Sequence, residues 1–508
     1  MYGAVLMGET LLEQTSIKTK SFLERMPKVK RKKKGQFFTS RETAKYMAEM
    51  FDLSLLPEHI SICDPGSGTG LLSAAIVDRL NETKCVKSIN LTCYETDPDV
   101  KDLLVENLEL IKSLSVIPLE YSLITESYLL SQSHDFEADP LASPDQKKFD
   151  LIIANPPYLR IMRNDPSALA MPTVVHGAPN LYFLFAAMSL FNLKDGAEMV
   201  YIIPRSWTSG AYFTSFREYL LKNGKLSHIH LFISRDKVFK DETVLQETMI
   251  IKVVKSDVIP EKVLITSSVS NNDFKDLTTL TVPYGTVVAG KEQFVFLPTN
   301  NDDMTVIKKI HSYDKTMPEE GIRMRTGIVV DFRQRDELRE SPGEHVVPLF
   351  YSQHIRDGKV NHNPSGKDCE WIVDEKPGLI QRNKNYVFCK RFTAKEENRR
   401  LQCGVYMATD FPEYSAIGTQ NKINYVDAVD GSEMDLPTTY GIYTLLNSTL
   451  FDMYYRVLNG STQVNSTEIN SIPVPPLDAI KEMGKRLIES NNMTTENCDR
   501  IMLEVAYG

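Results

Sequence analysis

The sequence lacks any apolar run long enough to cross a membrane. A spanning helix needs roughly 20 predominantly apolar residues, and no stretch of this 508-residue chain approaches that length. The first ten residues, MYGAVLMGET, also lack the positively charged segment and apolar core of a signal peptide. We therefore expect a cytoplasmic protein with no membrane anchor.

Cysteine is scarce, and its spacing suggests no pairing. The seven cysteines are scattered along the chain, and none forms a Cys-x-x-Cys pair. This usage is typical of a reducing compartment and gives no structural zinc motif. His228 and His230 alternate along one predicted strand without a third ligand nearby. We therefore expect a packed strand there, and no metal site.

An excess of positive charge is absent as well. The chain has 58 Lys and Arg against 67 Asp and Glu, a formal net charge of −9. That balance does not by itself indicate a nucleic-acid binder, although a large acidic protein can still carry a local basic face. Six of the seven residues from Lys28 to Lys34 are cationic. The arm formed by residues 1–34 is therefore either a solvated segment or one that contacts phosphates.

What the chain does contain is typical of a globular protein. Apolar residues make up 42% and charged residues 25%, and this length suggests about three domains or two large ones. From residue 35 to about 260, predicted strands alternate with predicted helices, which indicates an α/β domain with a mainly parallel sheet. The predicted strands are residues 60–63, 89–94, 151–154, 199–203, 228–232 and 249–254, and the predicted helices are residues 71–80, 100–114, 181–191 and 213–223.

The second half of the chain has a different pattern. A polar stretch around residues 256–276 marks a boundary, and after about residue 300 short strand-like pieces alternate with Gly, Pro and Asn turns. Residues 300–508 are therefore expected to form a separate mixed α+β domain. Its basic residues suggest a phosphate or base-edge surface: Arg382, Lys384, Lys390, Arg391, Lys395, Arg399 and Arg400.

The first motif with chemical meaning is a glycine-rich turn, Asp64 to Gly70, between a predicted strand and a predicted helix. Glycines there permit positive φ and let a ligand approach the backbone closely. Glu95 ends the next strand, where an acidic residue typically holds ribose hydroxyls. Together these features indicate an adenosine-containing cofactor. A nucleoside triphosphate is disfavoured, because no Lys-Ser or Lys-Thr pair follows the loop.

The second motif is Asn155-Pro156-Pro157-Tyr158, directly after the apolar strand 151–154. The prolines force the chain away from the sheet at its carboxyl edge, where ligands bind in open α/β folds. The Asn155 carboxamide and the Pro156 carbonyl offer acceptors for both hydrogens of an amino group. Tyr158 offers a ring that stacks on a flat substrate. The same four residues also make a good structural turn.

Three motifs, taken in their order along the chain, resemble those of the γ-class adenine-N6 DNA methyltransferases of type II restriction–modification systems, such as the TaqI and PstI kinds. The motifs are Gly35-Gln36-Phe37-Phe38-Thr39, the Asp64–Gly70 loop and Asn155–Tyr158. The resemblance covers about residues 28–255. It implies a Rossmann-like S-adenosylmethionine-dependent catalytic domain over residues 35–260 and a DNA target-recognition domain over residues 300–508. It also implies double-stranded DNA as the partner, and it allows a separate cognate restriction endonuclease that acts on the same site. We expect a monomer, because a palindromic site can be modified one strand at a time.

The resemblance implies roles for individual residues. Thr39, Asp64, Gly66 and Gly68 would contact the methionine part and backbone region of S-adenosylmethionine. Glu95 would hold the ribose, and Thr96 would lie beside the adenine. Tyr128 would stand where the family has the aromatic of an Asp-Phe pair, with Ser127 in place of the acid. The catalytic set would be Asn155, Pro156, Tyr158 and Phe239, with Phe239 stacking on the flipped base or serving as an ordinary core aromatic.

This chemistry needs neither a metal nor a titratable general base. Hydrogen bonds to Asn155 and Pro156 would localise the lone pair of an adenine N6 that has been flipped out of the duplex. Two alternatives remain open from the sequence. One is a methyltransferase that acts on RNA or on a protein amide, and the other is a DNA-binding module without catalysis.

Overall fold

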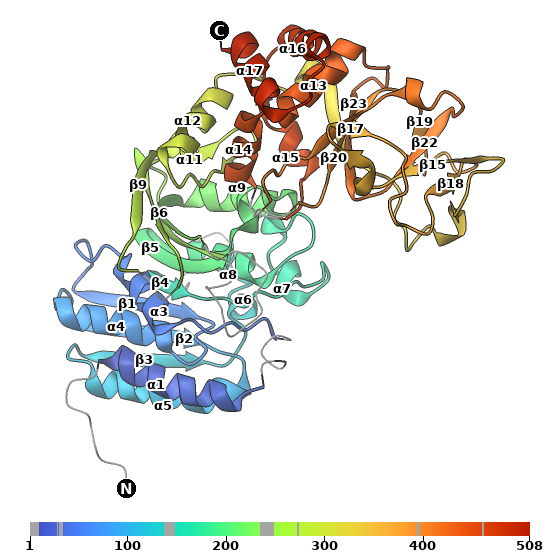
Figure 1. Cartoon of the computed structure of the whole chain (residues 1–508). Coiled ribbons are helices and arrows are strands. Elements are labelled where there is room, and N and C mark those ends of the chain that lie inside the picture. The colour runs from blue at the N-terminus through green and yellow to red at the C-terminus, as the bar shows by residue number, and fades with distance from the viewer. Residues whose placement is uncertain are drawn as a thin grey trace. The chain divides into compact units, whose positions relative to one another are not determined.

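The computed structural model describes residues 10–27, 29, 34–136, 148–233, 248–271, 274–393, 397–459 and 462–507. The chain divides into two compact units, Met1–Val288 and Ala289–Gly508. Figure 1 shows the ribbon of the whole chain. The two compact units are named unit 1 and unit 2.

Unit 1 is built on a nine-stranded sheet with the order β3-β2-β1-β4-β5-β7-β6-β8-β9. The strands are β1 (His59–Pro65), β2 (Ser88–Tyr94), β3 (Leu119–Ile124), β4 (Phe149–Ala154), β5 (Leu193–Pro204), β6 (Lys225–Phe232), β7 (Thr248–Val254), β8 (Lys262–Ser268) and β9 (Thr278–Pro283). The five strands from β3 to β5 in this order pair in parallel. This α/β architecture is the predicted one.

Helices lie over this sheet, as Figure 1 shows. The helices of unit 1 are α1 (Leu11–Arg25), α3 (Arg41–Glu49), α4 (Leu71–Thr83), α5 (Pro98–Leu114), α6 (Tyr128–Ser131), α7 (Pro166–Leu169), α8 (Leu181–Asn192), α9 (Thr214–Asn223) and α11 (Tyr284–Val287). Strand β4 is buried along its whole length, which explains its continuous apolar sequence. Residues from α3, α4 and α5 pack with β1, β2 and β4 in one apolar core.

The strand order places the ends of β1 and β4 side by side. The chain runs outward from β1 to β2 and β3, and then returns to place β4 on the other side of β1. In open α/β sheets such a reversal leaves a crevice at the carboxyl ends of the strands, and ligands bind in it. Both sequence motifs begin there, because the glycine-rich loop follows β1 and Asn155 follows β4.

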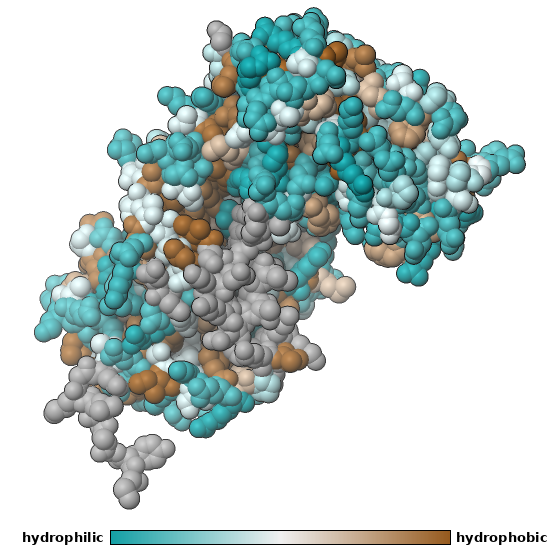
Figure 2. Space-filling view, in the orientation of Figure 1, coloured by the Kyte–Doolittle hydropathy of each residue, from teal (hydrophilic) through white to brown (hydrophobic). Residues whose placement is uncertain are grey.

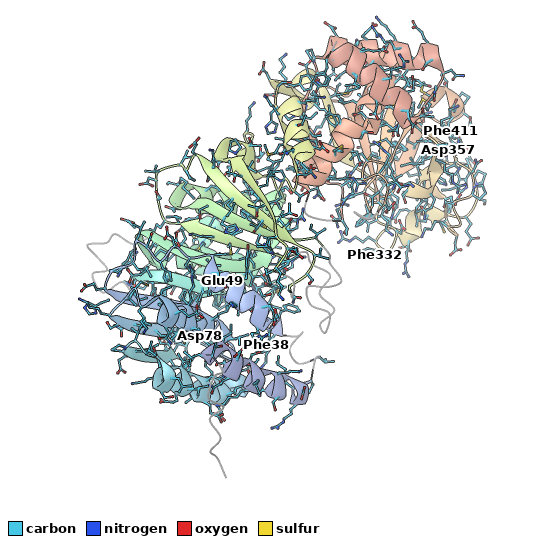
Figure 3. The ribbon with its side chains drawn as sticks, turned by 60° about the vertical axis from the view of Figure 1, so that its left-hand side comes forward. Phe38, Glu49, Asp78, Phe332, Asp357 and Phe411 are labelled. Atoms are coloured by element: carbon cyan, nitrogen blue, oxygen red, sulfur yellow. The ribbon has the colours of Figure 1, made fainter. Side chains whose placement is uncertain are left out.

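Part of the N-terminal arm is a packed helix. Thr10 and Glu13 form a capping box at the start of α1. The Asp78 carboxylate of α4 accepts the N–H groups of Leu11 and Leu12 at 3.0 and 2.8 Å. Asp78 is labelled in Figure 3. Of the cationic run, Lys28 and residues 30–33 lie outside the described residues, and Lys34 lies at the cavity described below.

Unit 2 combines a six-stranded sheet, a five-stranded sheet and a group of helices. The six-stranded sheet has the order β13-β23-β20-β21-β17-β16, with β13 (Ile322–Thr326), β16 (Ile355–Arg356), β17 (Lys359–Val360), β20 (Tyr386–Lys390), β21 (Cys403–Tyr406) and β23 (Ile423–Ala428). The five-stranded sheet has β14 (Leu338–Arg339), β15 (Val346–Phe350), β18 (Trp371–Val373), β19 (Gln381–Arg382) and β22 (Ala416–Thr419).

The helices of unit 2 are α12 (Asn301–Ile310), α13 (Leu436–Asn447), α14 (Thr449–Leu458), α15 (Ser466–Asn470), α16 (Leu477–Ser490) and α17 (Thr495–Ala506). They share one apolar core with strands of the six-stranded sheet. Gly441 of α13 and Gly484 of α16 meet where the helices pack, because a Cβ on either would collide with the other helix. Small residues at this point therefore let the two helices approach closely.

The face drawn in Figure 2 is largely polar where its residues are described. Figure 2 shows hydrophobic residues scattered over a mostly hydrophilic face. Within the described part of the chain, no helix is both long enough and apolar enough to span a bilayer.

Candidate functional site

A cavity of about 480 Å³ opens at the carboxyl ends of β1, β2 and β4. This volume is in the range of small-molecule and cofactor sites. The predicted site residues that line it are Thr39, Gly66, Gly68, Glu95, Thr96, Tyr128, Asn155 and Pro156. Asp64 and Tyr158 lie outside this lining, and Phe239 lies outside the described residues.

The glycine-rich loop forms one wall of the cavity. Gly66 and Gly68 have φ values of 76° and 55°, a conformation that favours glycine. The N–H groups of Gly66 and Ser67 both donate to the Tyr94 carbonyl at 2.9 Å, which holds the loop against the end of β2. A Cβ on Gly68 would come within 3.6 Å of the Phe38 ring. The loop is thus fixed by its own hydrogen bonds, with bare backbone facing the cavity.

Asp64 lies behind this loop and is fully buried. One of its carboxylate oxygens accepts the Ser73 hydroxyl at 2.7 Å, and the other, Oδ1, accepts no hydrogen bond from any described residue. Burial raises the pKa of Asp64 to about 7, and the nearby Glu95 carboxylate adds to the shift. Asp64 therefore holds an unused acceptor next to the cavity wall.

Glu95 is fixed at the end of β2. Its two carboxylate oxygens accept the N–H groups of Gly68 at 2.8 Å and Asp97 at 2.7 Å. Burial raises the pKa of this carboxyl. Each oxygen keeps a second lone pair, so the carboxylate has capacity for the hydroxyl groups of a ligand.

Aromatic rings form another wall. Tyr128 is buried, and its ring centroid lies 4.9 Å from that of Tyr94 and 5.5 Å from that of Phe185. Its hydroxyl lies 3.1 Å from the Ser189 hydroxyl and accepts the Asn192 amide at 3.1 Å. The ring is therefore held rigidly beside the cavity.

Sequence reasoning missed the acid on this side of the cavity. Glu126 lines it, two residues before Tyr128, whereas the Ser127 hydroxyl accepts a helix N–H at the start of α6. The acid that the resemblance calls for is thus available one position earlier in the chain. Glu126 follows strand β3, which ends at Ile124 and was not predicted, so its place at the carboxyl edge of the sheet was missed.

Asn155 is oriented by the segment that precedes α3. Its amide Nδ2 donates to the Phe37 carbonyl at 2.6 Å and to the Thr39 hydroxyl at 3.0 Å. Because a carbonyl only accepts, the group that faces Phe37 must be the amide nitrogen. The carboxamide oxygen Oδ1 is buried and accepts no hydrogen bond from the described residues. Both donors of Asn155 are used, and its acceptor is free.

Tyr158 packs behind the cavity lining. Its hydroxyl donates to the Ile202 carbonyl at 3.0 Å, and its backbone N–H donates to the Gly35 carbonyl at 2.9 Å. Its ring is stacked on Phe37 with centroids 5.3 Å apart, and Phe37 lines the cavity. The described structure thus brings Phe37 to the cavity and places Tyr158 behind it.

A second set of residues that the sequence did not single out ties the segment 34–39 to α5. The Asp97 carboxylate accepts the Lys34 ammonium at 2.6 Å and the Gln36 amide at 2.8 Å, and it also caps α5. Lys34 bonds Asp99 as well, at 2.9 Å. These contacts hold the Gly35–Thr39 segment against the start of α5, at the cavity beside the carboxyl ends of β1 and β2.

The two histidines of β6 belong to a buried polar network. His228 and His230 each lie 2.9 Å from the Thr266 hydroxyl, and Tyr46 also reaches it at 2.7 Å. Burial lowers the pKa of His228 to about 4 and that of His230 to about 3. Both rings are therefore neutral at physiological pH and are engaged in the packing of α3 on the sheet.

Three potential metal ligands also meet in unit 2. Ligand atoms of His354, His362 and Glu370 lie within 4.8 Å of one another. However, Nδ1 of His354 accepts the Tyr351 N–H at 3.1 Å, so the proton of the neutral ring sits on Nε2, 3.7 Å from the Glu370 carboxylate. A metal would need the lone pair that this proton occupies. Because His354 Nε2 carries this proton, and forms no hydrogen bond with a described residue, we assign the cluster no ion.

The predicted basic surface of unit 2 is only partly exposed. Lys384 is buried and pairs with Asp427 at 2.6 Å, and Arg400 is fully buried, donating to Asn459 at 3.1 Å. Lys395 lies outside the described residues. Lys384 and Arg400 therefore support the fold and are not available to phosphates, because charges this deeply buried are retained only with partners.

Known proteins resemble this chain over nearly its whole length. Residues 76–239 match the family model of the Eco57I restriction-modification methylase. Type II methyltransferase M.BsuBI of Bacillus subtilis is 34% identical over 477 residues, 93% of each chain. Type II methyltransferase M.PstI of Providencia stuartii is 34% identical over 468 residues, 90% of each chain.

A solved structure shares the fold. The type IIL restriction-modification enzyme MmeI in complex with DNA aligns with a TM-score of 0.52 and 13% identity, over 97% of this chain and 73% of that chain. An identity of 34% over at least 90% of two relatives shows a common family, which is more than a common fold. This chain belongs to the type II DNA methyltransferases of restriction–modification systems, a family that takes its methyl group from S-adenosylmethionine.

Proposed function

We propose that this protein transfers a methyl group from S-adenosylmethionine to N6 of an adenine flipped out of duplex DNA at one recurring sequence. The observation that carries the proposal is the free acceptor of Asn155. Its amide donors are used by Phe37 and Thr39, which leaves Oδ1 to accept from a substrate. The exocyclic amino group of a base would donate a hydrogen bond to Asn155 Oδ1, which accepts none from a described residue.

The residues of the cavity fit the proposed methyl donor. The φ values of Gly66 and Gly68 expose bare backbone to a ligand, and the unpaired Oδ1 of Asp64 suits a methionine ammonium group. Glu95 would accept ribose hydroxyls, with Thr96, Glu126 and Tyr128 around the adenine. When bound, the donor supplies an electrophilic methyl group on a sulfonium.

The substrate nitrogen needs activation that these residues provide. The lone pair of adenine N6 is delocalised into the ring, so the nitrogen is a poor nucleophile. Two hydrogen bonds, to Asn155 Oδ1 and to the Pro156 carbonyl, would localise that lone pair and aim it at the methyl carbon. The target base has to leave the helix to reach these acceptors. Phe37, with Tyr158 stacked behind it, and Phe239 from the other side, would stack on it.

The biological role follows from the family. We propose that methylation protects a DNA site from a separate restriction endonuclease. We also propose that the chain acts as a monomer, because a palindromic site can be modified one strand at a time.

The proposal is tested by following tritium from labelled S-adenosylmethionine into unmethylated plasmid DNA, RNA and protein. We expect transfer to DNA alone. Asn155→Ala should lower the rate roughly 100-fold or more, as removal of a directed transition-state hydrogen bond does, while cofactor affinity stays close to that of the parent. Asn90→Ala, at an exposed position of β2, is the matched control and should be fully active. A fully active Asn155→Ala variant would refute the proposal.

A further inference from the structure

One end of the six-stranded sheet in unit 2 brings together three loops. Strands β13 and β20 end there and β23 begins there, because both pair with β23 in the antiparallel direction. The loops are residues 327–335 after β13, residues 391–393 after β20, and residues 420–422 before β23. We call their combined surface the loop end.

Hydrogen bonds hold these loops against each other. The Asn421 N–H donates to the Val329 carbonyl at 2.8 Å, and the Arg391 N–H donates to the Lys422 carbonyl at 2.9 Å. The Arg391 guanidinium also donates to the Asn421 carbonyl at 3.0 Å. Gly327 passes so close to the Gln420 carbonyl that a Cβ would collide with it. The loop end is therefore a defined surface, and substitutions of Phe332, Arg333 or Phe392 remove none of these contacts.

Two phenylalanines stand exposed on this surface. Phe332 is 68% exposed and Phe392 is 46% exposed, and they are the large aromatic side chains that the described part of unit 2 leaves exposed. Figure 3 shows Phe332 at the surface of its unit, apart from Asp357 and Phe411. An arginine lies over each ring: Arg333 at 5.5 Å from the Phe332 centroid, and Arg391 at 5.6 Å from that of Phe392.

The charge of the loop end is positive, in contrast to the net negative charge of the chain. Arg333, Arg335 and Lys422 are exposed and form no ion pair with a described residue. Their nearest acidic neighbours along the loop are Asp331 and Asp336. Unpaired cations suit phosphates, and arginine suits the guanine edge in the major groove. Exposed aromatic rings suit the thymine methyl group in the major groove, and they can wedge between base steps of a duplex.

We propose that the loop end is the surface through which unit 2 contacts and reads duplex DNA, with Phe332 and Phe392 against bases and Arg333, Arg335 and Lys422 on base edges or phosphates. The proposal rests on the proposed function, since it assigns the recognition of the DNA substrate to these residues. It explains why rings that would be costly to leave in water are kept at the surface beside guanidinium groups.

The test has a binding arm and a sequence-reading arm. Binding of the purified full chain to a fluorescent random-sequence duplex is measured by anisotropy at low salt, with a single RNA strand as the comparison ligand. Sequence reading is measured by mapping methylated positions in bacterial DNA after expression of each variant. Cofactor affinity and the circular dichroism spectrum of each variant check that unit 1 and the fold are intact.

Phe332→Ala and Phe392→Ala should each weaken duplex binding about 10-fold, the scale of a lost aromatic–base contact. Arg333→Gln should relax at least one position of the methylated motif or weaken binding similarly. Val429→Ala is the matched control: this exposed side chain follows β23 at the opposite end of the same sheet, and its removal should change neither readout. If Phe332→Ala and Phe392→Ala weaken the binding of RNA more than the binding of duplex DNA, the choice of DNA as the partner is overturned.

The outcomes separate this proposal from the proposed function. If the parent methylates adenine and all three loop-end variants match it in affinity and motif, the loop end is not the reading surface and the proposed function stands. If the parent makes no methyladenine but the phenylalanine variants still lose duplex binding, the surface stands and the proposed chemistry fails.

Discussion

At the scale of single residues, the chemistry of the site depends on how one carboxamide is held. Asn155 donates both amide hydrogens to the segment before α3, through Phe37 and Thr39. Thr39 accepts one of these bonds, so its own hydroxyl proton is still available to a ligand. The sequence assigned Thr39 to the cofactor alone. The structure adds a contact with the residue that would bind the target base.

Changing Thr39→Val removes the hydroxyl but keeps the size of the side chain. We expect the single-turnover rate of methyl transfer to fall about 5-fold to 10-fold, the effect of one lost hydrogen bond, because Asn155 then keeps only the bond to the Phe37 carbonyl and is held less firmly. Thr39→Ser keeps the hydroxyl and should restore the parental rate. If the serine variant is as slow as the valine variant, the hydroxyl does not orient Asn155.

The buried carboxyl of Asp64 should leave a signature in the pH dependence of stability. Burial raises its pKa from an ordinary 3.8 to about 7, so between these values the folded protein keeps a proton that the unfolded chain has lost. The contribution of Asp64 to the free energy of unfolding therefore falls as pH rises from about 4 to about 7, and is constant above. Asp64→Asn removes this contribution.

Chemical denaturation of the parent and of Asp64→Asn across pH 5 to 8 checks the sign. We expect the variant to gain stability relative to the parent as pH rises to about 7, and then to keep a constant difference. A difference that does not change with pH would mean that Asp64 titrates near its ordinary value.

Some site residues could be predicted from the sequence and others could not. The glycine-rich loop and Asn155 are local motifs whose meaning depends on a strand directly before them, so pattern alone locates them. Glu126 and Phe185 reach the cavity from separate elements. Nothing in their local sequence distinguishes them from other surface acids and core aromatics.

At the scale of elements, buried strands were easier to predict than edge strands. Strand β4 is an unbroken apolar run, and it was found. Strand β3, with the sequence LEYSLI, and strand β9, with TTLTVP, lie at the two edges of the sheet and are half exposed. Their polar residues hide the strand pattern. Strand β8 is interior and mostly buried, and it was missed because it lies in the stretch 256–276 that was expected to be a boundary. The sheet continues through β8 and β9 to Pro283, beyond the expected limit at residue 260.

Helix α1 offers a test of how one element is attached. The Asp78 carboxylate accepts the two N–H groups at its start, while Thr19 donates to Thr69 of the glycine-rich loop at 2.9 Å. Asp78→Ala should cost about 1 to 2 kcal/mol of stability, as the loss of a helix cap does. Hydrogen exchange should show faster exchange along α1, with Glu82→Ala, an exposed neighbour on α4, as the control. Unchanged exchange in Asp78→Ala would show that α1 is held by its apolar contacts alone.

At the scale of the whole molecule, an acidic protein that binds DNA must concentrate its cations. The net charge of −9 opposes contact with a polyanion, so attraction has to come from local sets such as the loop end. Affinity for duplex DNA should fall steeply with salt, whereas affinity for S-adenosylmethionine should change little.

A triple change of Arg333, Arg335 and Lys422 to Gln should reduce the slope of log affinity against log salt by up to about 3, since each phosphate contact contributes about 0.9. Binding titrations at several salt concentrations measure this slope. A parental slope in the triple variant would place the phosphate contacts on other residues.

The identity of the methylated base tests the central claim most directly. Plasmid DNA that lacks methylation is incubated with the protein and S-adenosylmethionine, digested to nucleosides, and resolved by liquid chromatography and mass spectrometry. The proposed function predicts N6-methyldeoxyadenosine and no other methylated nucleoside. N4-methyldeoxycytidine would contradict the assignment of adenine, because the cytosine amino group would then be the one these acceptors bind. Absence of any methylated nucleoside would contradict the proposed reaction itself.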